Sequence, residues 1–338
     1  MTPSERKGMW FGLLGVTMFA VTLPVTRLAV GTPEDPHLSG VFLAMGRAVV
    51  AAGLSVLYLW FTRASRPSRE QWKGLSLVAL GVVFGFPLLT SLAMRHVEAT
   101  HASVITGVLP LATASLAAVM NKQKPSWGFW LCAVTGTGLV VGFALLRSGQ
   151  SGLHLQAADL LLLGAMAFAA VGYAWGGRMS QSMGPEQVIC WALVLSLPLT
   201  LPLAWFSQPT QAAPWSAWAG FAYVSLFSMW LGFFAWYRGL AMGGTVRVSQ
   251  IQLLQPFLGM LIAIPVLGEG LDATTVSFGL AVVATVFVSR RMAVQRWDGV
   301  AALAMTKDHR IHCEPGGRSS HASTVPLMQV TESPPTQT

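Results

Sequence analysis

The stretch from Val246 to Glu269, VRVSQIQLLQPFLGMLIAIPVLGE, constrains the fold more than any other part of the chain. It holds more than twenty mostly apolar residues, which as a helix cross about 30 Å of hydrocarbon. Two prolines, Pro256 and Pro265, interrupt that helix, and three glutamines give it a polar face. Because lipid disfavours such a face, we expect the segment to lie against protein or a wet cavity.

A second stretch, HASVITGVLPLATASLAAVM, repeats this layout in the first half of the chain. Ser103 and Pro110 stand 146 positions before Ser249 and Pro256. Proline-broken helices at corresponding places of two halves are typical of membrane repeat proteins with a pathway between the repeats. The sequence therefore predicts such a protein.

The composition agrees with a membrane location. Apolar residues make up 53% of the chain and charged residues 10%, against about 25% charged residues in soluble domains. The net charge of +8 lies in loops and tail rather than on a basic face, so no nucleic-acid partner is predicted. The three cysteines, Cys132, Cys190 and Cys313, are too far apart to indicate a disulfide or a metal site.

Apolar runs predict an all-α integral membrane fold with ten transmembrane helices. The expected spans are residues 8–30, 38–62, 73–94, 100–120, 127–146, 156–178, 186–206, 215–241, 246–267 and 273–291. With the N-terminus inside, 17 of the 21 Lys and Arg residues fall on the inner side and three on the outer side. This partition predicts cytoplasmic N- and C-termini.

Ten spans divide into five and five, and an odd number of spans makes the second repeat insert upside down. We therefore expect two inverted five-helix repeats, at residues 8–146 and 156–291. Residues 298–338 are polar, rich in Ser, Thr and Pro, and lack apolar periodicity. They are predicted to form a disordered cytoplasmic tail.

Two arginines fall within the predicted spans. Arg47 lies about ten residues into the second span, where a charge costs roughly 2.5–3.5 kcal/mol on insertion scales and should face a polar interior. It either attracts a carboxylate or phosphate of a substrate or binds the carbonyls of a broken helix. Arg27, at the end of the first span, either snorkels to the outer interface or closes the mouth of a cavity.

Ser249, Gln252 and Gln255 recur at intervals of three residues and so share one helical face. Facing a wet cavity, their polar groups would bind substrate; facing another helix, they would hold the bundle together. Pro256 frees a backbone carbonyl beside them, which favours the cavity.

The eighth span carries a dense aromatic cluster. Within it, Trp230, Phe234 and Tyr237 are predicted to contact substrate, with lipid-facing or interfacial positions as the alternative. Glycine repeats elsewhere predict close helix packing. These are Gly136, Gly138 and Gly142, and Gly172, Gly176 and Gly177.

Catalytic motifs are missing from the sequence, which contains no HExxH, no GxSxG and no paired carboxylates within a span. We expect no enzymatic activity, cofactor or metal. Of the thirteen acids, only Asp159 and Glu269 approach a span, each near an end. An acid-based proton relay at the midplane is therefore not predicted, and His96 and His101 are weak substitutes for one.

Three features together resemble the drug/metabolite transporter superfamily, EamA type, over roughly residues 8–291. They are the arginine in the second span, Pro110 in its apolar run, and SQIQLLQPFLGMLIAIPVLGEGLDATTVSFGLAVVATVFVSRR, where Pro256 precedes Gly268 and Glu269. The resemblance implies a bacterial inner-membrane carrier, often an exporter of amino acids and other metabolites. It also implies a central cavity between the two five-helix repeats.

Matched positions carry further expectations from this resemblance. Arg47 corresponds to the second-span arginine, and Pro110 and Pro256 correspond to the helix-breaking prolines that act as hinges. Glu269 corresponds to the carboxylate after the ninth span, whereas Gln123 stands at the equivalent place of the first repeat. A symmetric role for the glutamate is therefore not expected, and Glu269 is predicted to cap a helix or anchor a loop.

The sequence as a whole favours an inner-membrane secondary transporter that exports small metabolites such as amino acids by alternating access around a midplane cavity. A nucleotide-sugar or phosphate-ester antiporter is one alternative, although it would require several cavity-facing positive charges. A non-transporting membrane sensor or a membrane-embedded enzyme is another. The expected partners are a small-molecule substrate and the lipid bilayer, and formation of a homodimer is left open.

Overall fold

Backbone hydrogen bonding explains why the apolar runs are helical in the computed structural model. Hydrocarbon offers no water to backbone N–H and C=O groups, so a spanning segment must satisfy them internally. The structure describes residues 3–120, 124–125, 127–147, 156–243, 248–289 and 294–295, all within the compact unit Met1–Gln295. The expected disordered tail, residues 298–338, lies outside the described residues.

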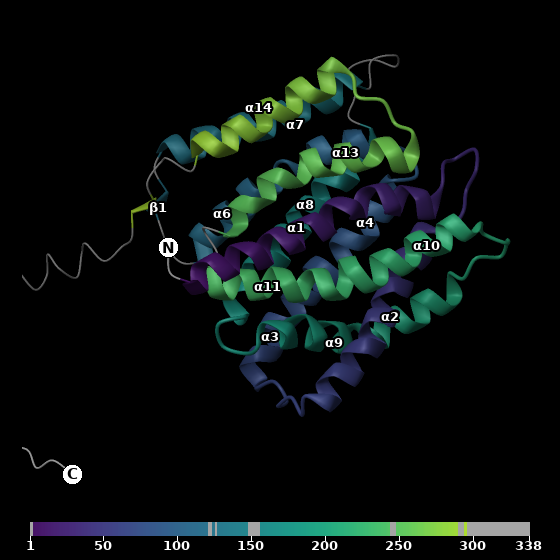
Figure 1. The fold of residues 1–338 in the computed structure, drawn as a ribbon, viewed down its shortest axis with the longest axis vertical. Coiled ribbons are helices and arrows are strands. Elements are labelled where there is room, and N and C mark those ends of the chain that lie inside the picture. Colours follow the sequence, from purple (N-terminus) through teal and green to yellow (C-terminus); the bar gives the residue numbers. More distant parts are fainter. Residues whose placement is uncertain are drawn as a thin grey trace, which may run out of the picture. The chain divides into compact units, whose positions relative to one another are not determined.

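Helices make up nearly all of the described residues (Figure 1). In chain order the elements are α1 (Pro3–Val30), α2 (Gly40–Phe61), α3 (Arg69–Val78), the π-helix η1 (Ala79–Gly85), α4 (Phe86–Ala93), α5 (Ala99–Thr106), α6 (Leu109–Met120), β1 (Lys124–Pro125), α7 (Trp127–Arg147), α8 (Ala157–Met179), α9 (Pro185–Phe206), α10 (Trp215–Tyr223), the π-helix η2 (Val224–Leu231), α11 (Gly232–Gly243), the 3₁₀-helix η3 (Ser249–Leu254), α13 (Gln255–Leu267), α14 (Ala273–Ser289) and β2 (Val294–Gln295). The short strands β1 and β2 pair antiparallel.

Six helical stretches in the described part are long and apolar enough to cross a membrane. They are Pro3–Val30, Gly40–Phe61, Arg69–Ala93, Ala157–Met179, Pro185–Phe206 and Trp215–Gly243. Shorter helical pieces occupy the other four predicted spans: α5 with α6, the apolar part of α7, η3 with α13, and α14. The predicted helical character of the chain is thus confirmed for the described residues.

Local sequence sets several helix ends. Ser39 begins α2, because its hydroxyl accepts a hydrogen bond from the Phe42 backbone N–H at 3.0 Å. Ser68 and Gln71 form a reciprocal capping box at the start of α3. Gly268 ends α13 with a left-handed φ of 69°, a conformation that costs glycine little. This turn leads directly into Glu269.

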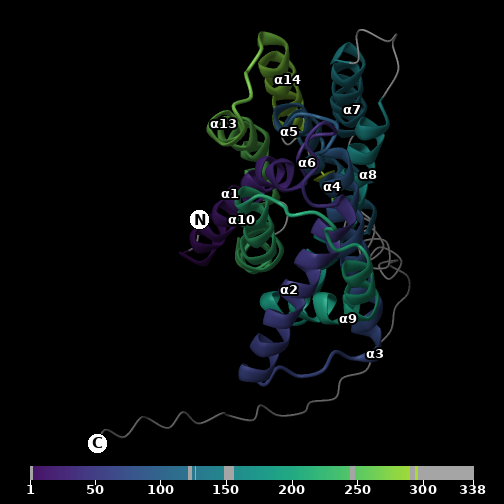
Figure 2. The same cartoon turned by 90° about the vertical axis from the view of Figure 1, so that its right-hand side faces the viewer.

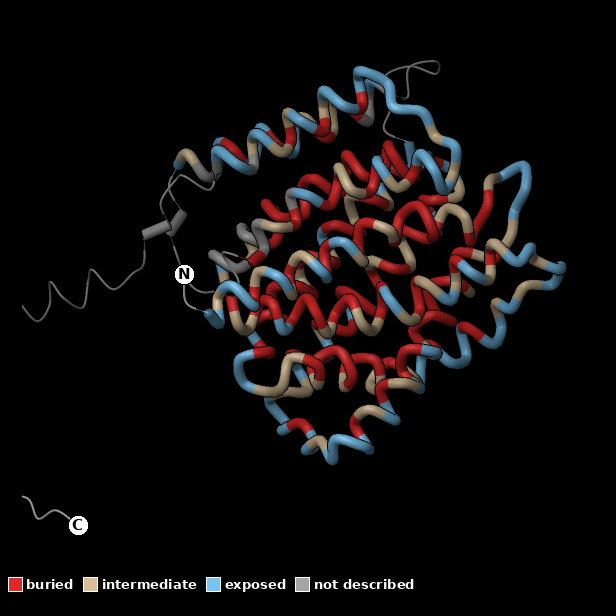
Figure 3. The backbone as a smooth tube through the Cα atoms, in the orientation of Figure 1, coloured by how far each residue is buried: buried red, intermediate tan, exposed pale blue. Residues whose placement is uncertain are grey.

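Helices of the first half, residues 3–147, pack against helices of the second half, residues 156–289. α1 lies along α11, α2 along α9, and α7 along α14 (Figures 1 and 2). In the same way η1 and α4 lie along α8, and α5 lies along α13. The buried core, shown in red in Figure 3, is therefore shared between the two halves.

Glycines bring α1 and α11 into backbone contact. A Cβ atom at Gly239 would lie 2.7 Å from the Gly12 nitrogen, which is closer than real Cβ atoms approach. Among the glycines expected to pack closely, Gly172 and Gly176 do so, against Val82 and the Tyr237 ring. Gly138, by contrast, has open space around it.

Two π-helical segments interrupt the long helices at corresponding places. η1 lies in the third predicted span and η2 in the eighth, and their starts, Ala79 and Val224, are 145 positions apart. Pro87, just after η1, lacks the N–H that a regular helix needs there. π segments are rare and frequently lie at functional sites, so their surroundings indicate where to look for one.

Candidate functional site

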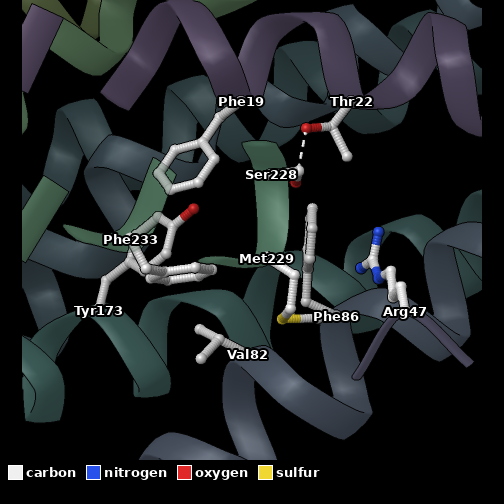
Figure 4. A pocket seen from close by; sticks show the side chains of 9 residues that line it. All are labelled: Phe19, Thr22, Arg47, Val82, Phe86, Tyr173, Ser228, Met229 and Phe233. Carbon is white, nitrogen blue, oxygen red and sulfur yellow. Dashed lines mark hydrogen bonds between the residues drawn. The ribbon is translucent and has the colours of Figure 1, made fainter. Parts of the chain in front are cut away.

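A small cavity lies between the two halves, beside both π-helical segments (Figure 4). Its lining comprises Phe19, Thr22, Arg47, Val82, Phe86, Tyr173, Ser228, Met229 and Phe233. The first five belong to α1, α2, η1 and α4, and the other four to α8, η2 and α11. The cavity is thus assembled from helices of both halves.

Arg47 supplies the charge of this cavity. Its side chain is only 2% exposed, and its Nε atom has no hydrogen-bond partner among the described residues. A buried guanidinium N–H without an acceptor is costly, and an oxygen atom of a bound anion would relieve that cost. Binding of a substrate by Arg47 stays a prediction.

Two hydroxyl groups and a set of aromatic rings form the rest of the wall. The Thr22 hydroxyl donates to the Ser228 hydroxyl at 2.9 Å, which links α1 to η2. The Phe19 ring stacks on Tyr173 at 6.0 Å and contacts Phe233 at 5.0 Å between centroids. Figure 4 shows Arg47 and Tyr173 at opposite sides of this group of side chains. One cation, polar hydroxyls and apolar rings together suit a small anion with an apolar part.

The cavity is small. The space open to water-sized spheres is about 10 Å³, which is room for about one water molecule. A metabolite would require the surrounding helices to move apart.

The three aromatic residues predicted to contact substrate belong to η2 and α11 but do not line the Arg47 cavity. Trp230 and Phe234 pack against the Tyr58 ring of α2, with centroids 6.5 Å and 5.0 Å away. Tyr237 is fully buried and donates its hydroxyl hydrogen to the Gly172 carbonyl at 3.1 Å. None of these three rings lines the Arg47 cavity, which Phe233 lines instead.

The predicted glutamine face is buried in the protein. Gln252 and Gln255 are 1% and 7% exposed, and η3 and α13 contact α1 beside them. Both amide atoms of Gln252 and the Oε1 atom of Gln255 have no hydrogen-bond partner in the described part of the chain. These side chains do not line the Arg47 cavity. The side chain of Ser249 lies outside the described residues.

Pro110 and Pro256 each follow a helix break, one in the fourth and one in the ninth predicted span. Pro110 is the second residue of α6, after a break between α5 and α6, and Pro256 is the second residue of α13, after η3. A Cβ atom at Gly107 would lie 3.6 Å from the Pro256 ring, so the two breaks are neighbours. Their role as hinges stays a prediction.

The structure contains a buried acid–histidine pair that the sequence did not predict. His101 Nε2 lies 2.7 Å from Asp159 Oδ1, and both residues are buried. The pair joins α5 to the first turn of α8. The sequence shows a histidine and an acid near apolar runs, but the two residues are 58 positions apart, so the sequence alone did not predict their contact.

Glu269 caps the start of α5, as the sequence predicted. Its Oε1 atom accepts from the Ala99 N–H at 2.7 Å and its Oε2 atom from the Thr100 N–H at 2.8 Å, at the start of α5. Arg27 donates to the Met94 carbonyl at 2.5 Å, so it binds the C-terminal end of α4 instead of lying free.

Comparison with known proteins agrees with this architecture. Several long apolar helices indicate a multi-pass membrane protein. The model of the EamA-like transporter family matches residues 6–145 and again residues 156–291. The chain belongs to the EamA-like transporter family.

Relatives and solved structures support the same family and fold. An uncharacterized transporter of Bacillus subtilis (strain 168), YdeK, is 44% identical over 83% of this chain and 96% of its own. A probable terminal-alkyne amino-acid exporter of Streptantibioticus cattleyicolor is 22% identical over 78% of this chain and 86% of its own. A solved crystal structure with 14% identity has a TM-score of 0.57 and covers 90% of this chain and 99% of its own. That likeness concerns the fold alone.

Proposed function

We propose that the protein is an inner-membrane secondary transporter that exports a small organic anion or zwitterion, such as an amino acid. The observation that carries this proposal is Arg47, a buried cation that lines a small cavity between the two halves and whose Nε atom has no acceptor among the described residues. The transporter names of its relatives, and the amino-acid exporter among them, support the same class.

The proposed architecture is ten transmembrane helices in two inverted five-helix repeats. Supporting observations are the family model matching each half once and the two π-helical segments at corresponding positions. The pairing of helices is also consistent with a twofold axis in the membrane plane, because α1 with α11 and α8 with η1 and α4 are equivalent pairs. Alternating access would then proceed by rocking of one repeat against the other.

The excess of Lys and Arg on one side supports cytoplasmic termini in the inner membrane. Reporter fusions at Gln123 and Arg296 should indicate cytoplasm, and a fusion near Gln211 should indicate the outside. A periplasmic signal at Gln123 would contradict the inverted-repeat topology.

A phosphate-ester antiporter is the second candidate. A phosphate carries more charge than one guanidinium neutralises, and Arg47 is the sole basic residue that lines the cavity in the described part of the chain. This favours a singly charged carboxylate over a phosphate ester.

The test begins with metabolites that accumulate in the medium of an overexpressing strain relative to a deletion strain. Export of each is then measured in proteoliposomes with the wild type, Arg47→Ala, Arg47→Lys and the control Lys73→Gln, whose side chain is exposed. Loss of the buried charge should weaken transport at least about 30-fold, since truncating a buried charged contact costs 2–5 kcal/mol. Unchanged export by a well-inserted Arg47→Ala variant would overturn the proposal.

A further inference from the structure

A second pocket lies at the C-terminal end of α2, beside the loop that leads to α3. It is a groove of about 760 Å³ between α2 and α9, two helices that lie side by side in Figure 2. Its walls include Trp60 and Phe61 of α2, Trp191 and Val194 of α9, and Arg63 and Arg66 of the loop. It shares no residue with the Arg47 cavity.

Unpaired positive charge surrounds one end of this groove. Arg63 and Arg66 are exposed, and neither has an ion-pair partner among the described residues. Arg69 and Lys73 follow within the next seven positions, against a single acid, Glu70. The lining of the groove therefore carries two positive charges, Arg63 and Arg66, and Arg69 and Lys73 lie outside that lining.

The backbone at Arg63 adopts an unusual conformation directly beside the groove. Arg63 adopts a left-handed φ of 47°, and its N–H donates to the Trp60 carbonyl while the Ala64 N–H donates to the Leu59 carbonyl. Glycine is the usual residue at such a helix end. An arginine at this position carries backbone strain that a glycine would not, and it lies two positions after the last residue of α2.

The apolar end of the groove belongs to the hydrocarbon region. Trp60 and Phe61 are 71% and 74% exposed at the end of an apolar helix, which is the position of aromatic belts at headgroup level. The indole N–H of Trp191 has no acceptor within the described part of the chain. The groove thus joins an apolar surface to a basic rim across the headgroup boundary.

We propose that the groove binds one anionic phospholipid of the surrounding leaflet. Its phosphate lies between Arg63 and Arg66, because arginine presents paired N–H donors that match phosphate oxygens. One of its two acyl chains lies along the apolar wall to which Val56 and Val194 contribute. Basic pockets between transmembrane helices bind anionic headgroups by the same combination of contacts.

Native mass spectrometry of the full chain tests the site. The protein is placed in nanodiscs that contain equal amounts of phosphatidylglycerol and phosphatidylethanolamine. It is then released from the nanodiscs in the mass spectrometer, and the lipids that stay bound to it are counted. The wild type and Arg69→Gln, a matched control because Arg69 does not line the groove, should retain phosphatidylglycerol preferentially. Arg63→Gln and Arg66→Gln should each reduce this retention about five-fold. Equal retention by all four proteins, or equal losses from Arg69→Gln, would overturn the proposal.

A second measurement separates lipid from free phosphate. Thermal unfolding in a neutral detergent is followed with added phosphatidylglycerol, inorganic phosphate or glycerol phosphate. Phosphatidylglycerol should raise the midpoint of the wild type and of Arg69→Gln, but not that of the Arg63→Gln, Arg66→Gln double variant. An equal rise with inorganic phosphate would show that the rim binds free anions rather than a lipid.

Discussion

His101 Nε2 and Asp159 Oδ1 lie 2.7 Å apart in the buried interior, although 58 positions separate them in the chain. The histidine comes from the first half and the aspartate from the second, so the pair ties the two halves together. Asp159 also accepts a hydrogen bond from the Gln156 N–H at 3.2 Å, as part of the cap of α8. The His101 ring in turn contacts Phe143, with centroids 5.0 Å apart.

Removing one partner of this pair should destabilise the protein strongly. We expect His101→Ala to lower the free energy of unfolding by about 3–5 kcal/mol, because Asp159 would be left buried without its partner. The double variant His101→Ala, Asp159→Ala should cost less than the sum of the single changes. Chemical unfolding in detergent measures this double-mutant cycle, and additive costs would mean that the two side chains do not interact.

Glu269→Gln should destabilise the start of α5. A carboxylate accepts both the Ala99 and Thr100 N–H groups, whereas an amide offers one acceptor oxygen and no charge. The expected cost is about 1–2 kcal/mol, read from the thermal unfolding midpoint. Glu70→Gln, at an exposed helix start, is the control and should change the midpoint less; equal shifts would argue against the cap.

Two glycine-to-alanine substitutions should change the stability of the protein in opposite directions. Gly239→Ala places a methyl group against the Gly12 backbone and should cost about 1–3 kcal/mol of stability. Gly138→Ala meets nothing within 4 Å and should stabilise by about 0.5–1 kcal/mol, since alanine favours a helix interior. Thermal unfolding of both variants in one detergent checks this. A stable Gly239→Ala protein would mean that α1 and α11 lie further apart.

Gln252→Leu should raise stability and lower transport together. The amide of Gln252 is buried without a partner among the described residues, so an apolar replacement removes a desolvation cost of about 1–3 kcal/mol. Transport should fall if the amide binds substrate once the helices separate. Unfolding and proteoliposome export are measured on the same preparation; normal export would remove Gln252 from the pathway.

Hydropathy predicted the helical membrane fold because a spanning chain has few ways to satisfy its backbone. It also singled out Arg47, since a charge in an apolar run must face something polar. Hydropathy alone did not decide which ring of the Trp230–Tyr237 cluster faces the cavity. η2 has a wider turn than an α-helix, so the 3.6-residue period does not hold through it. The His101–Asp159 contact depends on tertiary packing, which one sequence does not reveal.

The π-helical segments η1 and η2 differ from an α-helix in the register of their backbone hydrogen bonds. A π turn bonds residues five apart, whereas an α turn bonds residues four apart. If η1 or η2 tightened to α geometry, the helix beyond would rotate by about 100°, the turn of one residue. Phe86 follows η1 and Phe233 follows η2, and both line the cavity. A slip of one hydrogen-bond register in η1 would move the Phe86 ring relative to the cavity, whereas the same slip in η2 would also turn Gly239 of α11 away from Gly12.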